Sequence, residues 1–312
     1  MTTTAPPAPR AGTRSTLTVT ILLWIAVLLD GFDMVVIGAV LPSMIEDPTW
    51  QVTAAEGTQI VTAGLIGMTI GALAIGTLTD KLGRRWVMIV SVLAFSLLTL
   101  GMGFAGSVWM LMLLRFLAGV GLGGCLPTAI SMVTEFRGRA RAGSSTTTVM
   151  TGYHVGAVLT ALLAILMIEP FGWHSLFIVG AVPGIILAPI MFFLLPESPQ
   201  YLLAKGRIAE AEDIASRYGM ELSDELDRSA AQAAQEDKQR SSLASVLAPK
   251  YRRNSLAIWA TSFMGLLLVY GLNTWLPQIM RAADYDLGNS LGFLLVLNVG
   301  AVVGLIIAGK VS

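Results

Sequence analysis

The sequence predicts an all-α membrane protein, because it is rich in apolar residues, poor in charge and divided into long apolar runs. Hydrophobic residues make up 54% of the 312 residues and charged residues 13%, against roughly 25% charged residues in soluble domains. Apolar runs long enough for a helix to cross a bilayer, about 20 residues, occur eight times. We predict membrane-spanning helices near residues 17–44, 58–79, 86–106, 108–135, 146–168, 173–195, 255–280 and 289–309.

The chain begins with a proline-rich segment, residues 1–16, which we predict to be a disordered tail. The apolar run after it follows Arg10 and Arg14, as the core of a signal peptide would. However, this run is too long for such a core, lacks a small-residue cleavage site and contains two aspartates. We therefore predict that it is retained as the first span.

The first span carries two carboxylates, in the sequence Asp30-Gly31-Phe32-Asp33. A charge inside a membrane helix costs several kcal/mol, so such residues usually face a cavity or a partner. Residues three apart lie on one face of a helix, and two close carboxylates do not easily both stay charged at low dielectric. We predict a role for Asp30 and Asp33 in proton coupling or substrate binding. The alternative is local capping or pairing with a helix-packing arginine.

A short charged segment separates the second and third spans. Its sequence is Gly76-Thr77-Leu78-Thr79-Asp80-Lys81-Leu82-Gly83-Arg84-Arg85. We predict a tight loop whose glycines allow close packing, in which Asp80 accepts hydrogen bonds at a helix end. The three basic residues are expected to hold this loop on the cytoplasmic side.

The fourth span combines a basic residue with several glycines, in the run from Arg115 to Pro127. Such glycines allow close approach of backbones or distortion of a helix beside a cavity. Arg115 lies about seven residues, roughly 10 Å, from the outer end of its span, and Asp33 about ten residues from the outer end of the first, so their depths are compatible. We predict that Arg115 binds a substrate carboxylate as a fork of donors or neutralises Asp33. A purely structural ion pair is the alternative.

Other polar and aromatic residues of the spans are weaker candidates. His154 in the fifth span could relay protons, although a packing histidine fits the sequence as well. Tyr270, Asn273 and Trp275 in the seventh span offer a stacking surface and polar contacts, although such aromatic residues often form a belt at the membrane interface. Two histidines, one cysteine and no phosphate loop predict neither a metal site nor a cofactor.

The basic residues indicate the orientation of the helices. With the N-terminus inside, 17 of the 20 lysines and arginines lie in cytoplasmic segments, whereas Arg281 is the one basic residue of the external loops. We therefore predict a cytoplasmic N-terminus. The net charge of zero gives no reason to expect a nucleic-acid partner.

Charged residues also gather at the cytoplasmic end of the fourth span, where Glu135 is followed by Arg137, Arg139 and Arg141. Charges at this position are far from the middle of the membrane and suit a conformational latch better than a substrate site. The latch that we predict consists of Gly76, Asp80, Gly83, Arg84, Arg85, Glu135 and Arg141.

Residues 196–254 form the one sizeable polar segment, which opens with Pro196-Glu197-Ser198-Pro199. We predict a central cytoplasmic loop that separates a six-helix bundle, residues 17–195, from the start of a second bundle, residues 255–312. A simple solvated, amphipathic linker fits the same segment.

A weak internal repeat supports this division. Gly67, Gly71 and Gly76 recur 233 residues later as Gly300, Gly304 and Gly309, and Leu41-Pro42 is echoed by Leu276-Pro277. By this repeat the chain stops inside the second copy of the charged loop. We predict a fragment or a truncated reading frame that lacks about four further spans. Such a chain is not expected to transport by itself.

The charged segment from Gly76 to Arg85 resembles the loop signature (G-x-L-a-D-r-x-G-R-r) of the major facilitator superfamily of secondary transporters. The Asp-Gly-Phe-Asp sequence and the glycine-rich fourth span make the chain similar to the aromatic acid:proton symporters of that superfamily, from about residue 17 onward. Pro196 to Pro199 resembles the same position in sugar-porter and organic-acid branches. The resemblance implies the major facilitator fold, with a six-helix N-terminal half and the first two helices of the C-terminal half.

The resemblance also implies a proton-coupled carrier that imports aromatic carboxylic acids across the inner (plasma) membrane as a monomer. Its expected partners are a small aromatic acid, H⁺ and the lipid bilayer. Asp30, Asp33 and Arg115 are the principal site residues, and the possible substrate contacts are Phe32, His154, Tyr270, Asn273 and Trp275. The alternatives are a carrier of sugars, drugs or other organic acids, or a membrane protein that does not transport. A membrane enzyme is not expected.

Overall fold

The computed structural model describes residues 15–50, 52–138, 142–220 and 251–311. In these ranges the chain has eight spans long and apolar enough to cross a membrane. They are α1 (Thr16–Glu46), α2 (Ala54–Leu82), α3 (Arg84–Met102), α4 (Val108–Leu122) continued by α5 (Cys125–Arg137), α6 (Ala142–Phe171), α7 (His174–Leu194), α12 (Arg252–Ala282) and α13 (Leu287–Val311). The eight predicted spans are confirmed, and each helix end lies within four residues of its predicted position.

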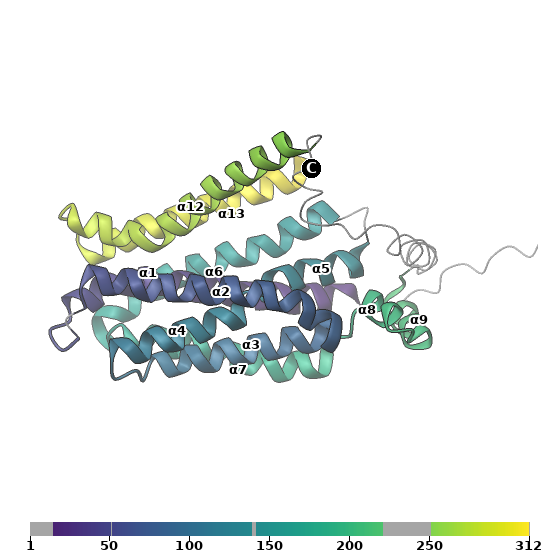
Figure 1. Ribbon diagram of the computed structural model, residues 1–312. Helices are drawn as coiled ribbons and strands as arrows, with labels where there is room; N and C mark the ends of the chain where they lie inside the picture. Colours follow the sequence, from purple (N-terminus) through teal and green to yellow (C-terminus); the bar gives the residue numbers. More distant parts are fainter. Residues whose placement is uncertain (1–14, 51, 139–141, 221–250, 312) are drawn as a thin grey trace, which may run out of the picture.

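The first six spans form one bundle, in which α1 is the most buried (Figure 1). Small residues set the contact of α1 with α6. A Cβ atom at Gly31 would overlap the backbone of Tyr153, and one at Gly156 would overlap the carbonyl of Leu28. Because glycine has no side chain, the two backbones approach closely along this face, and this approach fixes the depth of Asp30 and Asp33.

Glycines also set the contact of α2 with α4. A Cβ at Gly67 would overlap the carbonyl of Phe116, and one at Gly119 that of Gly64. The fourth span is interrupted between α4 and α5 at Gly123 and Gly124. Both effects expected of this glycine run, close approach and helix distortion, are therefore present.

The predicted loop between the second and third spans is wrong in extent. Helix α2 continues to Leu82 and α3 begins at Arg84, so Gly83 alone joins them, with φ of 94°. The residues before Gly83 are compatible with a helix, and a single glycine in this region of φ can reverse the chain. Gly76 lies inside α2 with no atom within 4 Å of a Cβ built there, so it does not serve close packing.

Helices α12 and α13 lie beside α1 and α6 at one end of the bundle, and α12 diverges from α1 at the other (Figure 1). Helix α13 stays against α6, since a Cβ at Gly309 would lie 2.7 Å from the Thr147 hydroxyl. The α1–α12 contact is at Gly38, where a Cβ would overlap the backbone of Asn273 and Thr274. At the same end, Arg281 pairs with Glu46. The other half of α12, residues 256–268, is exposed.

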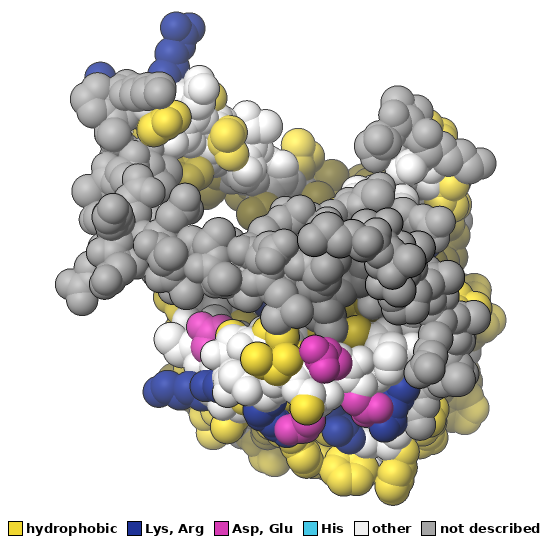
Figure 2. Space-filling view, turned by 90° about the vertical axis from the view of Figure 1, so that its right-hand side faces the viewer, with side chains coloured by type: hydrophobic (Ala, Val, Ile, Leu, Met, Phe, Trp, Pro, Cys, Tyr) yellow, Lys and Arg dark blue, Asp and Glu magenta, His cyan; other side chains and the backbone are white. Residues whose placement is uncertain are grey.

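Two short helices, α8 (Pro199–Ala204) and α9 (Ile208–Tyr218), follow α7 at the end where α12 diverges. Figure 2 views this end and shows acidic and basic side chains interspersed there, bordered by hydrophobic ones. The predicted N-terminal tail, up to residue 14, and residues 221–250 of the predicted central loop lie outside the described residues.

Candidate functional site

Asp33 and Arg115 form an ion pair in the interior of the bundle, between α1 and α4. Their side chains are 3% and 4% exposed, and the Thr99 hydroxyl of α3 donates to the second Asp33 oxygen at 2.5 Å. Buried charges are found paired and hydrogen bonded, because an unpaired one would be far more costly. Asp33 and Arg115, predicted to lie at compatible depths, are therefore in direct contact.

Space for the arginine comes from α2. A Cβ at Gly64 would lie 2.8 Å from Arg115 Nε. This Nε has no hydrogen-bond partner in the described part of the chain, although it is buried. Arg115 therefore keeps one unused donor besides the group that holds Asp33.

Asp30 has different surroundings from Asp33, although both are buried on α1. Its two carboxylate oxygens have no hydrogen-bond partner among the described residues, and the buried hydroxyl of Tyr153 has none either. Asp30 interacts electrostatically with Asp33 and Arg115. The two aspartates are thus neighbours with unequal partners, which their spacing in the sequence does not reveal.

Two cavities lie beside this pair, between α2 and α12. A small one is lined by Arg115, Tyr270, Thr274 and residues of α1 and α2. It shares Val61, Leu65, Tyr270 and Thr274 with a larger cavity of about 310 Å³, whose wall includes Trp275. Tyr270 and Trp275 therefore do line a space that reaches Arg115, and its volume lies at the lower end of small-molecule sites.

His154 and Asn273 belong to a second polar group, which joins α6, α13 and α12. The Nδ2 group of Asn298 donates to Asn273 Oδ1 at 2.7 Å, and Asn273 Nδ2 donates to the Val269 carbonyl at 2.8 Å. The remaining acceptor of Asn298, Oδ1, lies 3.0 Å from His154 Nδ1. His154 and Asn298 thus share a hydrogen bond that joins α6 to α13.

Phe32, another possible substrate contact, lies elsewhere. Its ring packs against Gly180 of α7 and is 4% exposed, and it lines neither of the two cavities. Sequence reasoning missed Thr99 and Asn298, because a lone hydroxyl or amide in a span carries no spacing pattern. Thr99 could have been found as a polar residue that lies in the third span at about the depth of Asp33.

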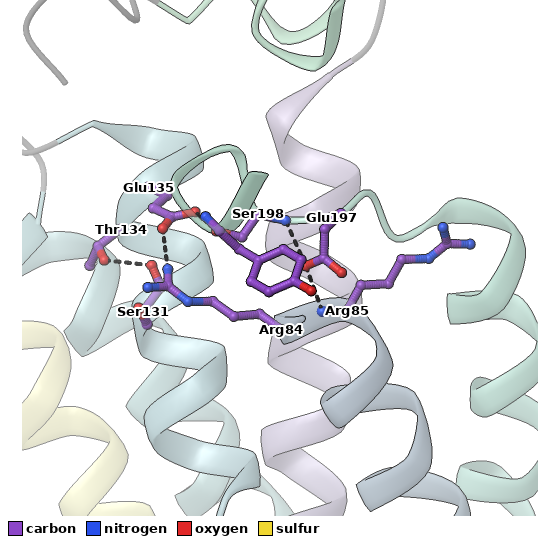
Figure 3. A network of polar contacts seen from close by, with 8 residues as sticks. Arg84, Arg85, Ser131, Thr134, Glu135, Glu197 and Ser198 are labelled. Carbon is purple, nitrogen blue, oxygen red and sulfur yellow. Dashed lines mark hydrogen bonds and ion pairs between the residues drawn. The ribbon is translucent and has the colours of Figure 1, made fainter. Parts of the chain in front are cut away.

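At the opposite end of the spans, Arg84 pairs with the buried carboxylate of Glu135 (Figure 3). The Ser198 hydroxyl donates to Glu135 Oε2 at 2.6 Å, and Glu197 Oε1 accepts the backbone N–H of Arg85 at 3.0 Å. This cluster ties α3, α5 and the start of α8 together. Sequence reasoning placed Arg84 and Glu135 in it but missed Glu197 and Ser198.

Asp80, another member predicted for the latch, is not part of this cluster. Asp80 is exposed and forms no hydrogen bond or ion pair with any described residue. Arg141 lies outside the described residues. The role of the cluster as a latch stays a prediction.

Comparison with known proteins gives three kinds of similarity. The family model described as Major Facilitator Superfamily matches residues 23–312. The benzoate transport protein of Acinetobacter baylyi is 32% identical over 300 residues, which cover 94% of this chain and 64% of that protein. The gallate transporter of Pseudomonas putida is 32% identical, with 93% and 64% covered. The 4-hydroxybenzoate transporter PcaK of Pseudomonas aeruginosa is 31% identical, with 93% and 65% covered.

The chain thus spans 64–65% of the length of these curated relatives. Among solved structures, the partially occluded inward-open xylose transporter XylE from E. coli matches with a TM-score of 0.71 at 17% identity. That match covers 93% of this chain and 71% of the other. At this identity the likeness concerns the fold.

Proposed function

The chain belongs to the major facilitator superfamily, within its aromatic acid branch, and from this we propose that it serves a proton-coupled carrier importing aromatic carboxylic acids. The superfamily is one of carriers and not of enzymes. The proposal concerns the whole protein, of which the described helices would supply the proton-coupling residues and one wall of the substrate site.

The observation that carries the proposal is the buried Asp33–Arg115 pair beside the cavity lined by Tyr270. An arginine fork recognises a carboxylate in two places, and Asp33 occupies Arg115 when no substrate is present. A substrate carboxylate would compete with Asp33 for the same donors. The aromatic ring of the substrate would then lie toward Tyr270 and Trp275, where ring stacking stabilises it.

Coupling to protons follows from the same competition. If a substrate carboxylate enters while Asp30 and Asp33 both stay charged, three carboxylates share one arginine in a low-dielectric site, which is unfavourable. A proton on one aspartate removes this repulsion, so acid and proton would bind together. We assign the proton to Asp30, because a buried carboxylate without a hydrogen-bond donor is costly to leave charged.

The names of the similar proteins support the substrate class. Benzoate, gallate and 4-hydroxybenzoate each have a carboxylate on an aromatic ring, and a niacin transporter of Acinetobacter baylyi is 30% identical over 290 residues. The shared part of these molecules, a ring with one carboxylate, is the part that Arg115 and Tyr270 would contact. The distribution of basic residues supports insertion in the cytoplasmic membrane with the N-terminus inside.

The test is uptake of labelled benzoate and 4-hydroxybenzoate by cells that express the full gene. Accumulation that a protonophore abolishes and that persists without sodium is the expected result. Uptake that survives the protonophore but stops without sodium would contradict proton coupling. Uptake of xylose but of neither acid would contradict the substrate class.

A further inference from the structure

A third cavity, of about 400 Å³, lies where α8 and α9 meet the ends of the membrane bundle. Its wall includes the first residues of α3, the last residues of α7 and residues of α8 and α9. It is separate from the proposed substrate site, because the two share no lining residue. Nothing in the proposed transport mechanism uses it.

Three basic residues, Arg85, Arg207 and Arg217, and three acidic ones, Glu197, Glu210 and Asp213, line this cavity. Arg207 pairs with Glu210 at 2.5 Å, and Arg217 pairs with Asp213 at 2.6 Å. The Glu197 carboxylate accepts two backbone N–H groups, at the start of α3 and at residue 198.

Arg85 has no acidic partner among the described residues. Its Nη2 group donates to the carbonyl of Phe192, and its Nε is buried without a partner. The guanidinium also lies over the rings of Trp86 and Phe192, 5.9 and 5.7 Å from their centres. Because no carboxylate among the described residues pairs with its charge, an anion in the cavity would form a charge-assisted hydrogen bond with it. The other two arginines of the cavity, Arg207 and Arg217, each pair with a carboxylate of α9.

The apolar wall beside Arg85 continues onto the membrane surface of the bundle. Trp86 is 46% exposed and Phe193 77% exposed, and both line the cavity. These residues stand at the first turn of α3 and the last turn of α7, where the spans leave the bilayer. A tryptophan at that depth is typical of the headgroup region, and hydrophobic side chains border the charged ones on this face (Figure 2).

We propose that this cavity binds the phosphodiester headgroup of a glycerophospholipid from the leaflet at this end of the protein. Arg85 faces the phosphate, and the acyl chains follow Trp86 and Phe193 into the bilayer. A soluble phosphate compound would use Arg85 as well but would leave the apolar wall unused. The bound lipid would connect α3 and α7 with α9, beside the Arg84–Glu135 cluster.

The test is native mass spectrometry of the purified protein titrated with phosphatidylglycerol in detergent. One basic residue near a membrane surface changes the affinity for an acidic lipid about fivefold, so Arg85→Gln should weaken lipid binding by about that factor. Arg252→Gln is the matched control, because Arg252 is exposed at the same end on α12 and does not line the cavity. It should bind lipid like the wild type.

A second variant should increase the affinity of the cavity for lipid instead of lowering it. Asp213→Asn breaks an exposed pair and leaves Arg217 as an additional free cation in the wall, so it should strengthen lipid binding. Because this pair is on the surface of α9, its loss should leave the melting temperature unchanged. The melting temperature of Arg85→Gln is measured as well, so that misfolding of that variant is detected. Equal lipid binding by wild type, Arg85→Gln and Asp213→Asn would overturn the proposal. Displacement of the lipid by an equal concentration of glycerol 3-phosphate would show a site for soluble phosphates instead.

Discussion

At the scale of single residues, the two aspartates of α1 differ in their hydrogen-bond and ion-pair partners. Asp33 is held by Arg115 and Thr99, whereas Asp30 has no donor in the described part of the chain. Removing one partner of a buried ion pair leaves an uncompensated charge and costs about 3–5 kcal/mol. Removing the charge of a carboxylate without partners should cost much less.

Asp33→Asn and Asp30→Asn are therefore expected to differ in stability while both impair transport. Asp33→Asn should lower the melting temperature, because it leaves Arg115 charged and unpaired. Asp30→Asn should melt like the wild type but lose accumulation driven by the proton gradient. Melting curves in detergent and uptake assays measure the two effects. Normal accumulation by both variants would contradict the assignment of the coupling site.

Arg115→Lys is expected to raise the half-saturating substrate concentration in uptake. Lysine keeps the charge that neutralises Asp33 but replaces a two-pronged donor with a single point of contact. The loss of one charge-assisted hydrogen bond corresponds to about 1.5–3 kcal/mol, or roughly a tenfold to hundredfold change in affinity. Uptake kinetics equal to those of the wild type would instead indicate a purely structural ion pair.

At the scale of helices, the glycines of α2 are not equivalent. Gly67 faces the backbone of α4 with no room for a Cβ, whereas a Cβ at Gly76 would meet nothing within 4 Å. Overpacking a helix contact costs about 1–3 kcal/mol. Replacing a glycine by alanine in a free stretch of helix instead gains about 0.5–1 kcal/mol.

Gly67→Ala should therefore lower the melting temperature, and Gly76→Ala should leave it unchanged or raise it. The two substitutions add the same methyl group to the same helix, so each controls for the other. Melting followed by tryptophan fluorescence in one detergent compares them directly. A similar drop in both variants would contradict the close α2–α4 contact.

The sequence was sufficient for the helices but not for all contacts between them. Apolar run length predicted all eight spans, because crossing the bilayer imposes a minimum length, and counting residues from the span ends placed Asp33 level with Arg115. Helical spacing does not tell which neighbouring helix supplies a donor, so the difference between Asp30 and Asp33 was not predictable. The loop predicted before Gly83 was too long, because glycine and charged residues occur at helix ends as well as in loops.

At the scale of the whole molecule, α12 meets the bundle at one end and leaves it at the other (Figure 1). The contact consists of Gly38 against Asn273 and Thr274, together with the Glu46–Arg281 pair, in which Arg281 Nε lies 3.0 Å from Glu46 Oε1. An exposed pair of this kind contributes up to about 1 kcal/mol. In a protein that alternates between two conformations, that amount changes their ratio about fivefold.

Arg281→Gln should therefore make α12 separate from α1 more often at the end where the Glu46–Arg281 pair lies. In a Thr274→Cys, Cys125→Ser background, the new thiol should react up to about fivefold faster with a membrane-impermeant maleimide when Arg281 is replaced. Glu169→Gln removes a charge at the same end of α6 and should leave the rate unchanged. Equal rates in all three proteins would show that the Glu46–Arg281 pair does not hold the helices together.

The separation of Asp33 from Arg115 along the chain has a consequence for synthesis of the protein. The two partners are 82 residues apart, which takes about 4–16 s at ribosomal rates of roughly 5–20 residues per second. During that interval α1 has already entered the insertion machinery with two carboxylates, each opposing insertion by about 2.5–3.5 kcal/mol at the centre of a helix. The apolar residues of α1 must offset this cost before Arg115 has been synthesised. The length and hydropathy of α1 therefore allow the helix to insert while Asp33 still lacks its partner.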